Sequence, residues 1–368
     1  MEHPKLRLTI PWISLELPAQ EQICRILELN ELVALAIMPD AHYGYDLCIG
    51  GVALTTGVIS PSFVGYDIGC GMCHVNTSLS VRELGLEKQK DREKLFKKLA
   101  GVVPSGVGGT NDVGTDFIFR SASGNSDLDK QVRPNVIKQM CTLGSGNHFL
   151  EIGENSSHII GVTVHSGSRR VGYDIAAWYM AQGRLLPLDS DLGQAYLSDM
   201  LWAQDFALEN RRLMLKEALY LLGFSDDDIE SFFAPTVLIN ESHNHAVPYA
   251  DGLMLHRKGA TAAEEGQMGV ISSNQRDGVW ITRGLGNKEF LSSASHGAGR
   301  VMSRKAASKK GSVSDLEKLM RGIVCRTDKE ILDEAPWAYK KIEPVLAAQD
   351  GLLVDVLDHF KPIIVLKG

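Results

Sequence analysis

The string from Val64 to His74 gathers three residue types that bind metal ions. It reads Val64-Gly-Tyr-Asp-Ile-Gly-Cys-Gly-Met-Cys-His74. Cys70, Cys73 and His74 match a c-type haem attachment pattern, but that chemistry needs export to an oxidising compartment. Cys70 and Cys73 could form half of a structural zinc site, which needs another close Cys or His pair. A third interpretation gives Asp67 and Cys70 to a metal site that distant histidines complete.

Three histidines stand where a rigid strand could present a metal ligand. His148 follows a Gly-Ser-Gly-Asn turn, His165 ends an apolar segment, and His243 follows the apolar Thr236–Asn240. Any one such histidine is more often a hydrogen-bonded or surface residue. Together with Asp67 and Cys70, they form a set that suits Mn, Zn or Fe, and the residue types do not select among these metals.

His296 has neighbours that favour phosphate chemistry. It lies in Leu291-Ser-Ser-Ala-Ser-His-Gly-Ala-Gly-Arg300, ahead of a basic segment that runs to Lys310. A neutral imidazole can attack or protonate a phosphate while backbone amides and arginine hold the anion. A helix start with a solvated basic face explains the same residues, and from composition alone it is the stronger explanation.

The elements that must position these residues follow from hydrophobic periodicity. We expect helices over 83–100 and 195–223, a long surface loop over Val103–Ser126, and a mostly helical chain after Ala298. Alternation and β-branched runs predict strands over Leu32–Met38, Gly51–Thr56, His158–His165, Thr236–Asn240 and Val279–Thr282. Strands and helices do not alternate regularly, which predicts an α+β fold. No linker or repeat divides the chain, so we expect a single domain over 1–368.

Composition restricts the class of protein. The chain carries 38 Lys+Arg and 45 Asp+Glu, a net charge of −7, with 44% hydrophobic residues. Its longest apolar stretches fall short of the roughly 20 residues that span a bilayer, and the first residues do not form a signal peptide, so we expect a cytoplasmic protein. Glycine is unevenly spread: 22 of 36 lie in 44–71, 144–172 and 252–299. These segments contain most of the candidate site residues, so we expect their loops to meet at one cleft.

Taken together, several long strings resemble the RtcB-type RNA-splicing ligases and occur in that family's order. The resemblance begins at residue 38 and reaches the last residue. The matching strings are Met38-Pro-Asp-Ala-His-Tyr-Gly44, Ile49-Gly-Gly-Val52, Val58-Ile-Ser-Pro61, Val64-Gly-Tyr-Asp-Ile-Gly-Cys-Gly71, Leu143-Gly-Ser-Gly-Asn-His-Phe-Leu-Glu151, His165-Ser-Gly-Ser-Arg169, His243-Asn244, His256-Arg-Lys-Gly-Ala260, Ser295-His-Gly-Ala-Gly-Arg-Val-Met-Ser-Arg304, Ala338-Tyr-Lys340 and Lys367-Gly368.

The resemblance implies a role for each site residue. His296 matches the histidine that attacks GTP and carries GMP, and Asp40 matches an acidic residue needed after that step. The implied ligands of two Mn(II) ions are Asp67, Cys70, His148, His165 and His243, with Cys70 as the bridge. The implied nucleotide contacts are Asn147, Glu151, Tyr339 and Lys367, together with Ser272 and Asn274 in the loop that shapes the pocket. Arg169 and Arg300 match arginines that hold RNA phosphates.

The implied activity is a GTP- and Mn-dependent RNA ligase in tRNA splicing or RNA repair. It joins RNA 3′-phosphate or 2′,3′-cyclic phosphate ends to 5′-hydroxyl ends through a histidine-GMP intermediate. The implied protein partner is archease, and we expect a monomer. The alternatives are a metal-dependent 2′,3′-cyclic phosphodiesterase and an RNA-end-binding protein with impaired ligation.

Three features depart from the family pattern. Ser272-Ser-Asn-Gln275 replaces the usual Pro-Gly-Ser-Met, Arg170 replaces a glycine, and the segment between Val103 and Leu143 is short. The first change lies in a loop that shapes the expected GTP pocket and therefore affects GTP binding. The second adds a positive charge near the expected path of the RNA. Positive residues also gather at Arg169-Arg170, Arg257-Lys258 and Arg300–Lys310, and local phosphate contacts of this kind allow RNA binding despite the negative net charge.

Overall fold

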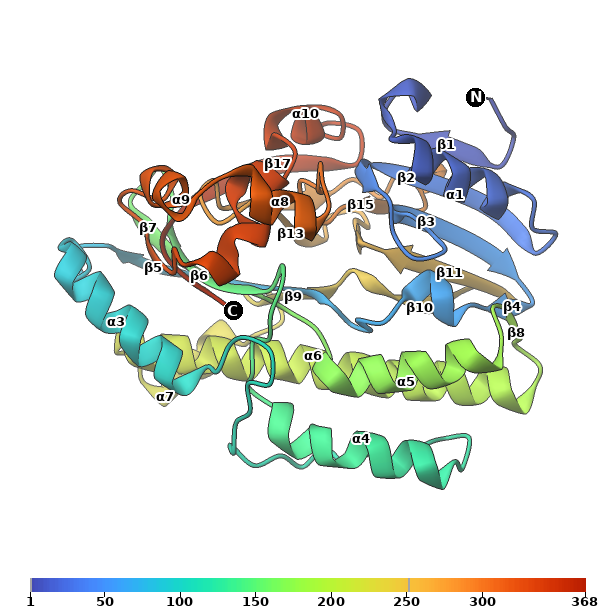
Figure 1. Cartoon of the computed structure of the whole chain (residues 1–368), viewed down its shortest axis with the longest axis horizontal. Coiled ribbons are helices and arrows are strands. Elements are labelled where there is room, and N and C mark those ends of the chain that lie inside the picture. Colours follow the sequence, from blue (N-terminus) through green and yellow to red (C-terminus); the bar gives the residue numbers. More distant parts are fainter. Residues whose placement is uncertain (1, 251) are drawn as a thin grey trace.

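Two β-sheets form the centre of the molecule, as the computed structural model shows for residues 2–250 and 252–368 (Figure 1). The larger sheet has the strand order β13-β14-β17-β6-β7-β5-β9, with β16 paired to β17 beside this path. Its strands are β5 (Gly71–Ser80), β6 (Phe149–Glu154), β7 (Ile159–Ser166), β9 (Ile239–Ser242), β13 (Met268–Ser272), β14 (Val279–Gly284), β16 (Val324–Cys325) and β17 (Val354–Lys367).

The smaller sheet has five strands in the order β1-β2-β3-β11-β10. They are β1 (Leu6–Leu8), β2 (Leu32–His42), β3 (Ile49–Thr56), β10 (Asn244–Ala250) and β11 (Leu253–Lys258). Two short pairs complete the strands, namely β4 (Val58–Ile59) with β8 (Leu186–Pro187) and β12 (Ala260–Ala262) with β15 (Ser293–Ser295). The chain passes from the larger sheet to the smaller one between β9 and β10, where His243 lies.

Helices cover the sheets from two sides (Figure 1). The long α6 packs on β5, β7 and β9, α5 packs on α6, and α4 packs on α5. The helices are α1 (Leu17–Leu27), α2 (Pro61–Val64), α3 (Gln89–Val102), α4 (Ser126–Gln139), α5 (Arg169–Gln182), α6 (Asp191–Leu222), α7 (Asp226–Phe232), α8 (Arg304–Lys310), α9 (Val313–Leu319) and α10 (Ile342–Ala347). Short 3-10 turns are η1 (Trp12–Ser14), η2 (Lys288–Phe290), η3 (Lys329–Glu334) and η4 (Pro336–Ala338).

The core beneath the larger sheet explains why α6 lies where it does. Leu215 and Leu219 are one helical turn apart on α6, and both are fully buried with Leu150 and Val162 of the sheet. An apolar stripe of this spacing must be covered, because burial of each leucine stabilises the fold by about 2 kcal/mol. The helix therefore fixes the sheet strands that carry the candidate ligands.

The structure confirms the α+β class and most predicted elements. Strands occur at each predicted place, although the one predicted over Thr236–Asn240 begins only at Ile239, and residues 103–125 contain no helix or strand. The predicted helix over 83–100 begins at Gln89, after a turn that buries Leu86. Among the described residues, no helix combines the length and the apolar character needed to cross a membrane.

The prediction of a mostly helical chain after Ala298 was wrong. The helices there are short, and β17 is a 14-residue strand that pairs with both β14 and β6 in the middle of the larger sheet. Pro362 lies within this central strand, although proline lacks the N–H that such a strand donates. The ladder accommodates it with a register shift between Pro362 and Ile364.

Candidate metal and nucleotide site

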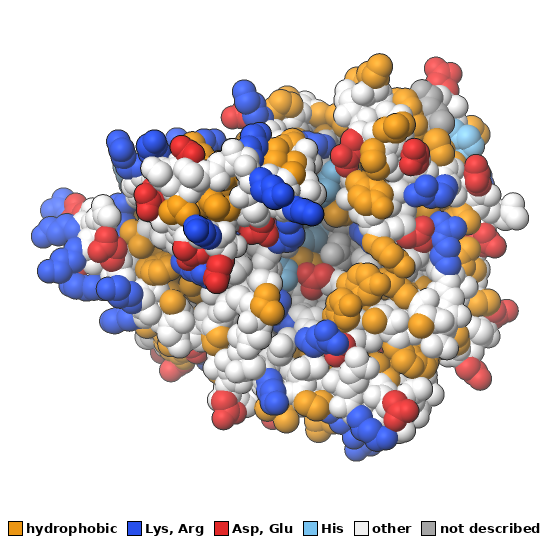
Figure 2. Space-filling view, in the orientation of Figure 1, with side chains coloured by type: hydrophobic (Ala, Val, Ile, Leu, Met, Phe, Trp, Pro, Cys, Tyr) orange, Lys and Arg blue, Asp and Glu red, His pale blue; other side chains and the backbone are white. Residues whose placement is uncertain are grey.

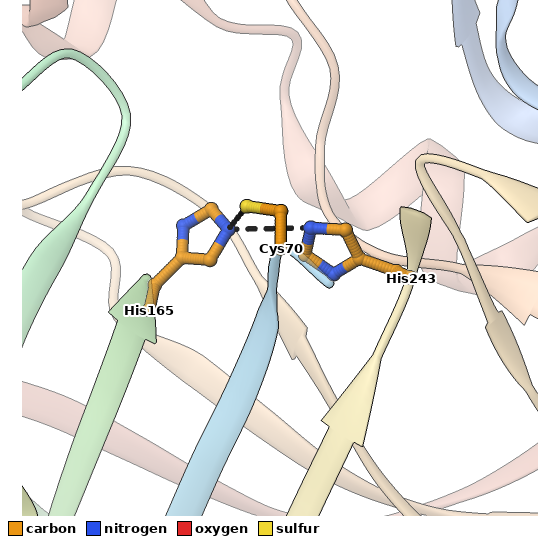
Figure 3. A group of neighbouring side chains, drawn as sticks. All are labelled: Cys70, His165 and His243. Atoms are coloured by element: carbon orange, nitrogen blue, oxygen red, sulfur yellow. Dashed lines mark hydrogen bonds between the residues drawn. The ribbon is translucent and has the colours of Figure 1, made fainter. Parts of the chain in front are cut away.

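The topology of the larger sheet brings four candidate ligands together at the same end of adjacent strands. Strand β5 runs antiparallel to both β7 and β9, and Gly71 pairs with Ser166 and with Ser242. Cys70 therefore lies beside the ends of the two strands that carry His165 and lead to His243 (Figure 3). His148 immediately precedes β6, which pairs with β7 from Phe149 onward. Residues far apart in the sequence thus meet because these strands begin and end together.

The ligand atoms form two overlapping groups that share one thiol. Cys70, His165 and His243 make one group, and Asp67, Cys70 and His148 make the other; within each group the ligand atoms lie within 4.8 Å of one another. Cys70 Sγ is 3.4 Å from Nε2 of both His148 and His165. Cys70 therefore belongs to both groups.

The hydrogen bonds of the imidazole rings leave their metal-binding nitrogens free. His148 Nδ1 is 3.0 Å from the carbonyl oxygen of Leu143, and His165 Nδ1 is 3.1 Å from that of Asn147. A carbonyl oxygen only accepts, so each Nδ1 carries the proton and each Nε2 presents a lone pair. Burial lowers the pKa of His165 and of His243 well below the usual range, which keeps both rings neutral.

The cluster brings nitrogen, oxygen and sulfur atoms that can bind a metal close to one another. Nε2 of His165 lies 3.3 Å from Nε2 of His243, and Nε2 of His148 lies 2.9 Å from Asp67 Oδ2. Burial, together with the Asp67 charge, raises the pKa of the Cys70 thiol well above its usual range. A divalent cation would accept lone pairs from imidazole nitrogen and carboxylate oxygen and would favour the thiolate, so the donor set fits a metal site.

Neither cysteine alternative fits this geometry. Cys73 is buried in the apolar core beneath the larger sheet, and the His74 ring packs on Phe360 with Nδ1 2.8 Å from Thr163 Oγ1. The two residues therefore do not join Cys70 in one site. This excludes the haem-type motif and the cysteine-pair zinc site as arranged here.

The sequence did not single out Arg211, which holds the metal-binding edge together. Its guanidinium is fully buried on α6, and its Nη1 donates to the carbonyl oxygens of Gly69 at 2.7 Å and Ser166 at 2.8 Å. Its Nη2 is 3.3 Å from Ser242 Oγ. One side chain thus joins the segments next to Cys70, His165 and His243. One sequence feature could have indicated that Arg211 is buried. It lies on the apolar stripe of α6, four residues before Leu215.

A pocket of about 320 Å³ opens beside the cluster. It contains every predicted nucleotide contact and the predicted nucleophile, and its volume suits a small ligand. Its lining includes Asn147, Glu151, Ser272, Asn274, His296, Arg300, Tyr339 and Lys367. The molecular surface is hollowed here, with histidine visible inside the hollow (Figure 2). The glycine-rich segments do meet at one cleft.

His296 links the pocket to the metal cluster. Its ring centroid lies 4.7 Å from that of His243, and its Nδ1 is 2.7 Å from Asp40 Oδ2. Asp40 is fully buried at the end of β2. Because Asp40 faces Nδ1, the nitrogen left to react is Nε2. The arrangement can therefore support attack by an imidazole whose other nitrogen faces a carboxylate at 2.7 Å.

The far wall of the pocket is positively charged. Glu334 is buried there and contacts Arg300 at 3.0 Å, Arg304 at 2.7 Å and Lys367 at 3.4 Å, and it accepts a hydrogen bond from Tyr339. Asp333 pairs with Arg304 at 3.0 Å. Three cations face two carboxylates, which leaves a surplus that favours an anion. Glu334 was not predicted, because no motif surrounds it.

Glu151 offers an unpaired acceptor inside this pocket. The side chain is 2% exposed, and burial raises its pKa well above the usual range. Its Oε1 has no hydrogen-bond partner among the described residues. A buried acceptor of this kind favours a ligand that brings donors to it.

The Ser272–Gln275 segment keeps a pocket despite its unusual sequence. Ser272 N donates to the carbonyl oxygen of His296 at 3.2 Å, and Ala298 N donates to that of Ser272 at 2.9 Å. All four residues of the segment line the pocket. The departure from the family pattern therefore alters the lining without closing the site.

Of the two predicted RNA-binding arginines, only Arg169 faces a second opening. It lines a pocket with Asp67, His148 and Tyr173, on the Asp67 side of the cluster. Gly144 has φ +86°, and a Cβ there would meet the Arg169 guanidinium at 1.8 Å, so only glycine leaves room for it. Arg300 instead lies in the nucleotide pocket and is bonded to Glu334.

The predicted basic cluster at Arg257-Lys258 was wrong. Both side chains are buried in β11, where Arg257 Nε donates to Ser293 Oγ and Lys258 Nζ donates to the carbonyl oxygen of Ser62. Burial lowers the pKa of Lys258 to about 8. These residues cannot reach a phosphate at the surface, because their charged groups are hydrogen-bonded to partners inside the protein.

Comparison with known proteins gives a consistent result. The family model of the tRNA-splicing ligase RtcB matches residues 22–121 and 120–368. The chain is 32% identical to the RNA-splicing ligase RtcB of Escherichia coli K12, over all of this chain and 98% of that protein. It is 28% identical to the tRNA-splicing ligase RtcB of Methanococcus maripaludis, over 95% of this chain and 91% of that protein.

Proposed function

The chain belongs to the RtcB family, and on this basis we propose that it is a GTP-dependent RNA ligase with two Mn(II) ions. Its substrates are RNA ends that carry a 3′-phosphate or a 2′,3′-cyclic phosphate and RNA ends that carry a 5′-hydroxyl, in tRNA splicing or RNA repair. The observation that carries the proposal is the contact of His296 with Asp40 in a pocket beside the ligand cluster.

The two groups of ligands support a pair of metal ions bridged by Cys70. When bound, manganese supplies charge neutralisation and Lewis acidity at phosphorus. The protein itself holds these ligands in place through the backbone carbonyls of Leu143 and Asn147 and through Arg211. We therefore assign Asp67, Cys70, His148, His165 and His243 to metal binding.

In the first step His296 is the nucleophile. Its Nε2 attacks the α-phosphorus of GTP, a nitrogen–phosphorus bond forms, and pyrophosphate leaves. Asp40 at Nδ1 stabilises the positive charge that then develops on the ring. The surplus charge of Arg300, Arg304 and Lys367 over Asp333 and Glu334 favours the anionic nucleotide in the pocket.

In the next step His296 becomes the leaving group. An RNA 3′-phosphate oxygen attacks the phosphorus of the histidine-bound GMP, and His296 leaves as neutral imidazole. The 5′-hydroxyl oxygen then attacks the activated 3′-phosphate, loses its proton, and displaces GMP. A 2′,3′-cyclic phosphate requires prior opening by water. Arg169 provides a guanidinium for an RNA phosphate at the second opening.

Guanine specificity is proposed to rest on Glu151. The Watson–Crick edge of guanine carries two neighbouring donors, whereas adenine offers one donor and one acceptor. Donors of a bound guanine would favour the charged form of the buried Glu151, whose carboxylate can accept from both of them through its unpaired Oε1. Asn147, Ser272, Asn274, Tyr339 and Lys367 complete the proposed nucleotide site.

The test supplies manganese and RNAs that carry a 3′-phosphate, a 2′,3′-cyclic phosphate or a 5′-hydroxyl, with and without GTP. Joined RNA with GTP, and much less with ATP, is the expected result. Opening of a cyclic phosphate without GTP and without joined product would instead support the phosphodiesterase alternative. Binding of RNA ends with neither reaction would leave the binding-protein alternative.

A further inference from the structure

We propose that Tyr66 and Tyr173 form a stacking surface for a nucleobase of the RNA end that reaches the metal cluster. The proposal rests on the proposed function, because it takes RNA as the substrate. It adds a binding element at the pocket that Asp67 and His148 line, outside the nucleotide pocket. The ligand chemistry is that of an unpaired base attached to a phosphate.

The aromatic rings lie directly beside the candidate ligands. Tyr66 precedes Asp67 in the chain, and its ring centroid is 4.9 Å from that of Tyr173, with 21° between the planes. Tyr45 extends the row, with its centroid 5.5 Å from that of Tyr66. Both Tyr66 and Tyr173 line the pocket that contains Asp67 and His148. A base placed there is held next to the cluster rather than at a remote surface.

The rings are exposed to an unusual degree for so close a group. Tyr45 is 53% exposed, Tyr66 36% and Tyr173 43%. Val107, from the loop over 103–125, is 95% exposed and lines the same pocket. Grouped exposed apolar side chains mark binding surfaces more often than scattered ones do. Apolar side chains from separate segments of the chain therefore line the pocket. Such a surface suits the flat ring of a nucleobase.

The charge around the rings selects a nucleic acid rather than an apolar peptide. The Arg170 guanidinium lies 4.7 Å from the Tyr173 ring centroid, and its Nε is 2.7 Å from Asp174 Oδ1. Arg169 lines the same pocket, and its buried Nε has no partner among the described residues. Phosphate next to arginine, with a base on a tyrosine ring, is the usual chemistry of single-strand recognition.

The position of Asn147 explains how this surface connects with the reaction. Asn147 lines both the nucleotide pocket and the tyrosine-lined pocket. The phosphate of an RNA end that enters over Tyr66 and Tyr173 is thereby directed toward the cluster between the two pockets. Arg170, which departs from the family pattern, contributes to the same surface.

The test uses short single-stranded RNAs with the fluorescent base 2-aminopurine. One RNA carries it next to a 3′-phosphate and the other next to a 5′-hydroxyl, so the two arms identify the strand that stacks. We expect quenching of one probe by the protein. In Y173L the quenching is lost, and the KM for that RNA rises about tenfold, more than kcat falls. Y173F, which keeps the ring, restores both values.

Y220L is the matched control, because Tyr220 is 37% exposed on α6, where its hydroxyl donates to Asp226 and its ring lies beside the Lys216 ammonium group. A Y173L protein and a Y66L protein that both match Y220L in quenching and KM would overturn the stacking surface. GMP uptake without RNA, measured on the same preparations, separates the two proposals. A protein that takes up GMP and joins RNA, but is insensitive to Y173L, contradicts only this inference.

Discussion

Asp40 Oδ2 lies 2.7 Å from His296 Nδ1, across two segments that are more than 250 residues apart in the chain. In the proposed mechanism, this contact leaves Nε2 as the reacting nitrogen and places the Asp40 carboxylate behind the ring. It also predicts which step depends on Asp40. An imidazole that carries phosphorus on Nε2 leaves easily only while Nδ1 keeps its proton, and the carboxylate stabilises that proton.

D40N should therefore slow the transfer of GMP from His296 to RNA by about tenfold or more, and by more than it slows GMP uptake. The substitution keeps the shape of the side chain and removes its charge. Labelled protein is isolated, RNA with a 3′-phosphate is added, and the loss of label is followed with time. Release from D40N at the rate of the unmodified protein would contradict the role given to Asp40.

C70S should remove most bound manganese while the fold is kept, because serine does not supply a bridging thiolate at neutral pH. Metal content is measured after gel filtration, and circular dichroism reports the fold. C73A is the control, since Cys73 lies in the apolar core away from the ligands. Binding also displaces the Cys70 proton, so affinity should rise with pH. Full occupancy in C70S would refute the bridging position.

R211M should lower the free energy of unfolding by about 3 kcal/mol or more, because it leaves buried carbonyl oxygens without donors. Metal content should fall with it, since those oxygens belong to the ligand-bearing segments. The neighbouring R212M is the control: Arg212 pairs with Glu209 at 2.7 Å near the surface and should cost less than about 1 kcal/mol. Equal urea midpoints for the two variants would show that Arg211 has no special role.

Acid should destabilise the fold through His74. Burial lowers the pKa of His74 from 6.5 to about 3. The unfolded chain then binds more protons than the folded one between these values, so stability is present above pH 6.5 and is lost as the pH falls toward 3. Each such histidine contributes about 1.4 kcal/mol per pH unit in this range.

H74N keeps a hydrogen-bonding group near Thr163 and removes the titration. Urea unfolding at pH 7, 6 and 5, with a chelator present, should show a shallower loss of stability in H74N than in the unmodified protein. H158N is the control, because the His158 side chain is 80% exposed. Identical pH slopes for H74N and the unmodified protein would contradict this assignment.

The sequence predicted which residues lie together better than it predicted the scaffold that holds them. Asp67, Cys70 and the three histidines lie next to turns, where local residue types are informative, and the structure does bring them together. We did not predict the strand over Val354–Lys367, because its proline and the short helices before it obscure the alternation of apolar and polar residues that is typical of a strand. Sheet order, which places Cys70 between two histidines, depends on long-range pairing that periodicity does not encode.

Buried charges were the other failure of sequence reasoning. Arg211, Glu334 and Lys258 resemble surface charges in the sequence, yet each is buried and bonded to groups distant in the chain. Only the positions of their partners distinguish a structural charge from a solvated one. The apolar stripe on α6 offered a hint for Arg211, whereas nothing local marked Glu334.

The most direct test of the central claim measures covalent GMP and metal on the same sample by mass spectrometry, after incubation with GTP and manganese. We expect a GMP adduct on a peptide containing His296, about two metal ions per chain, and no adduct in H296A that retains its metal. Metal-loaded, folded protein that carries no GMP, or GMP attached elsewhere in the chain, would contradict it.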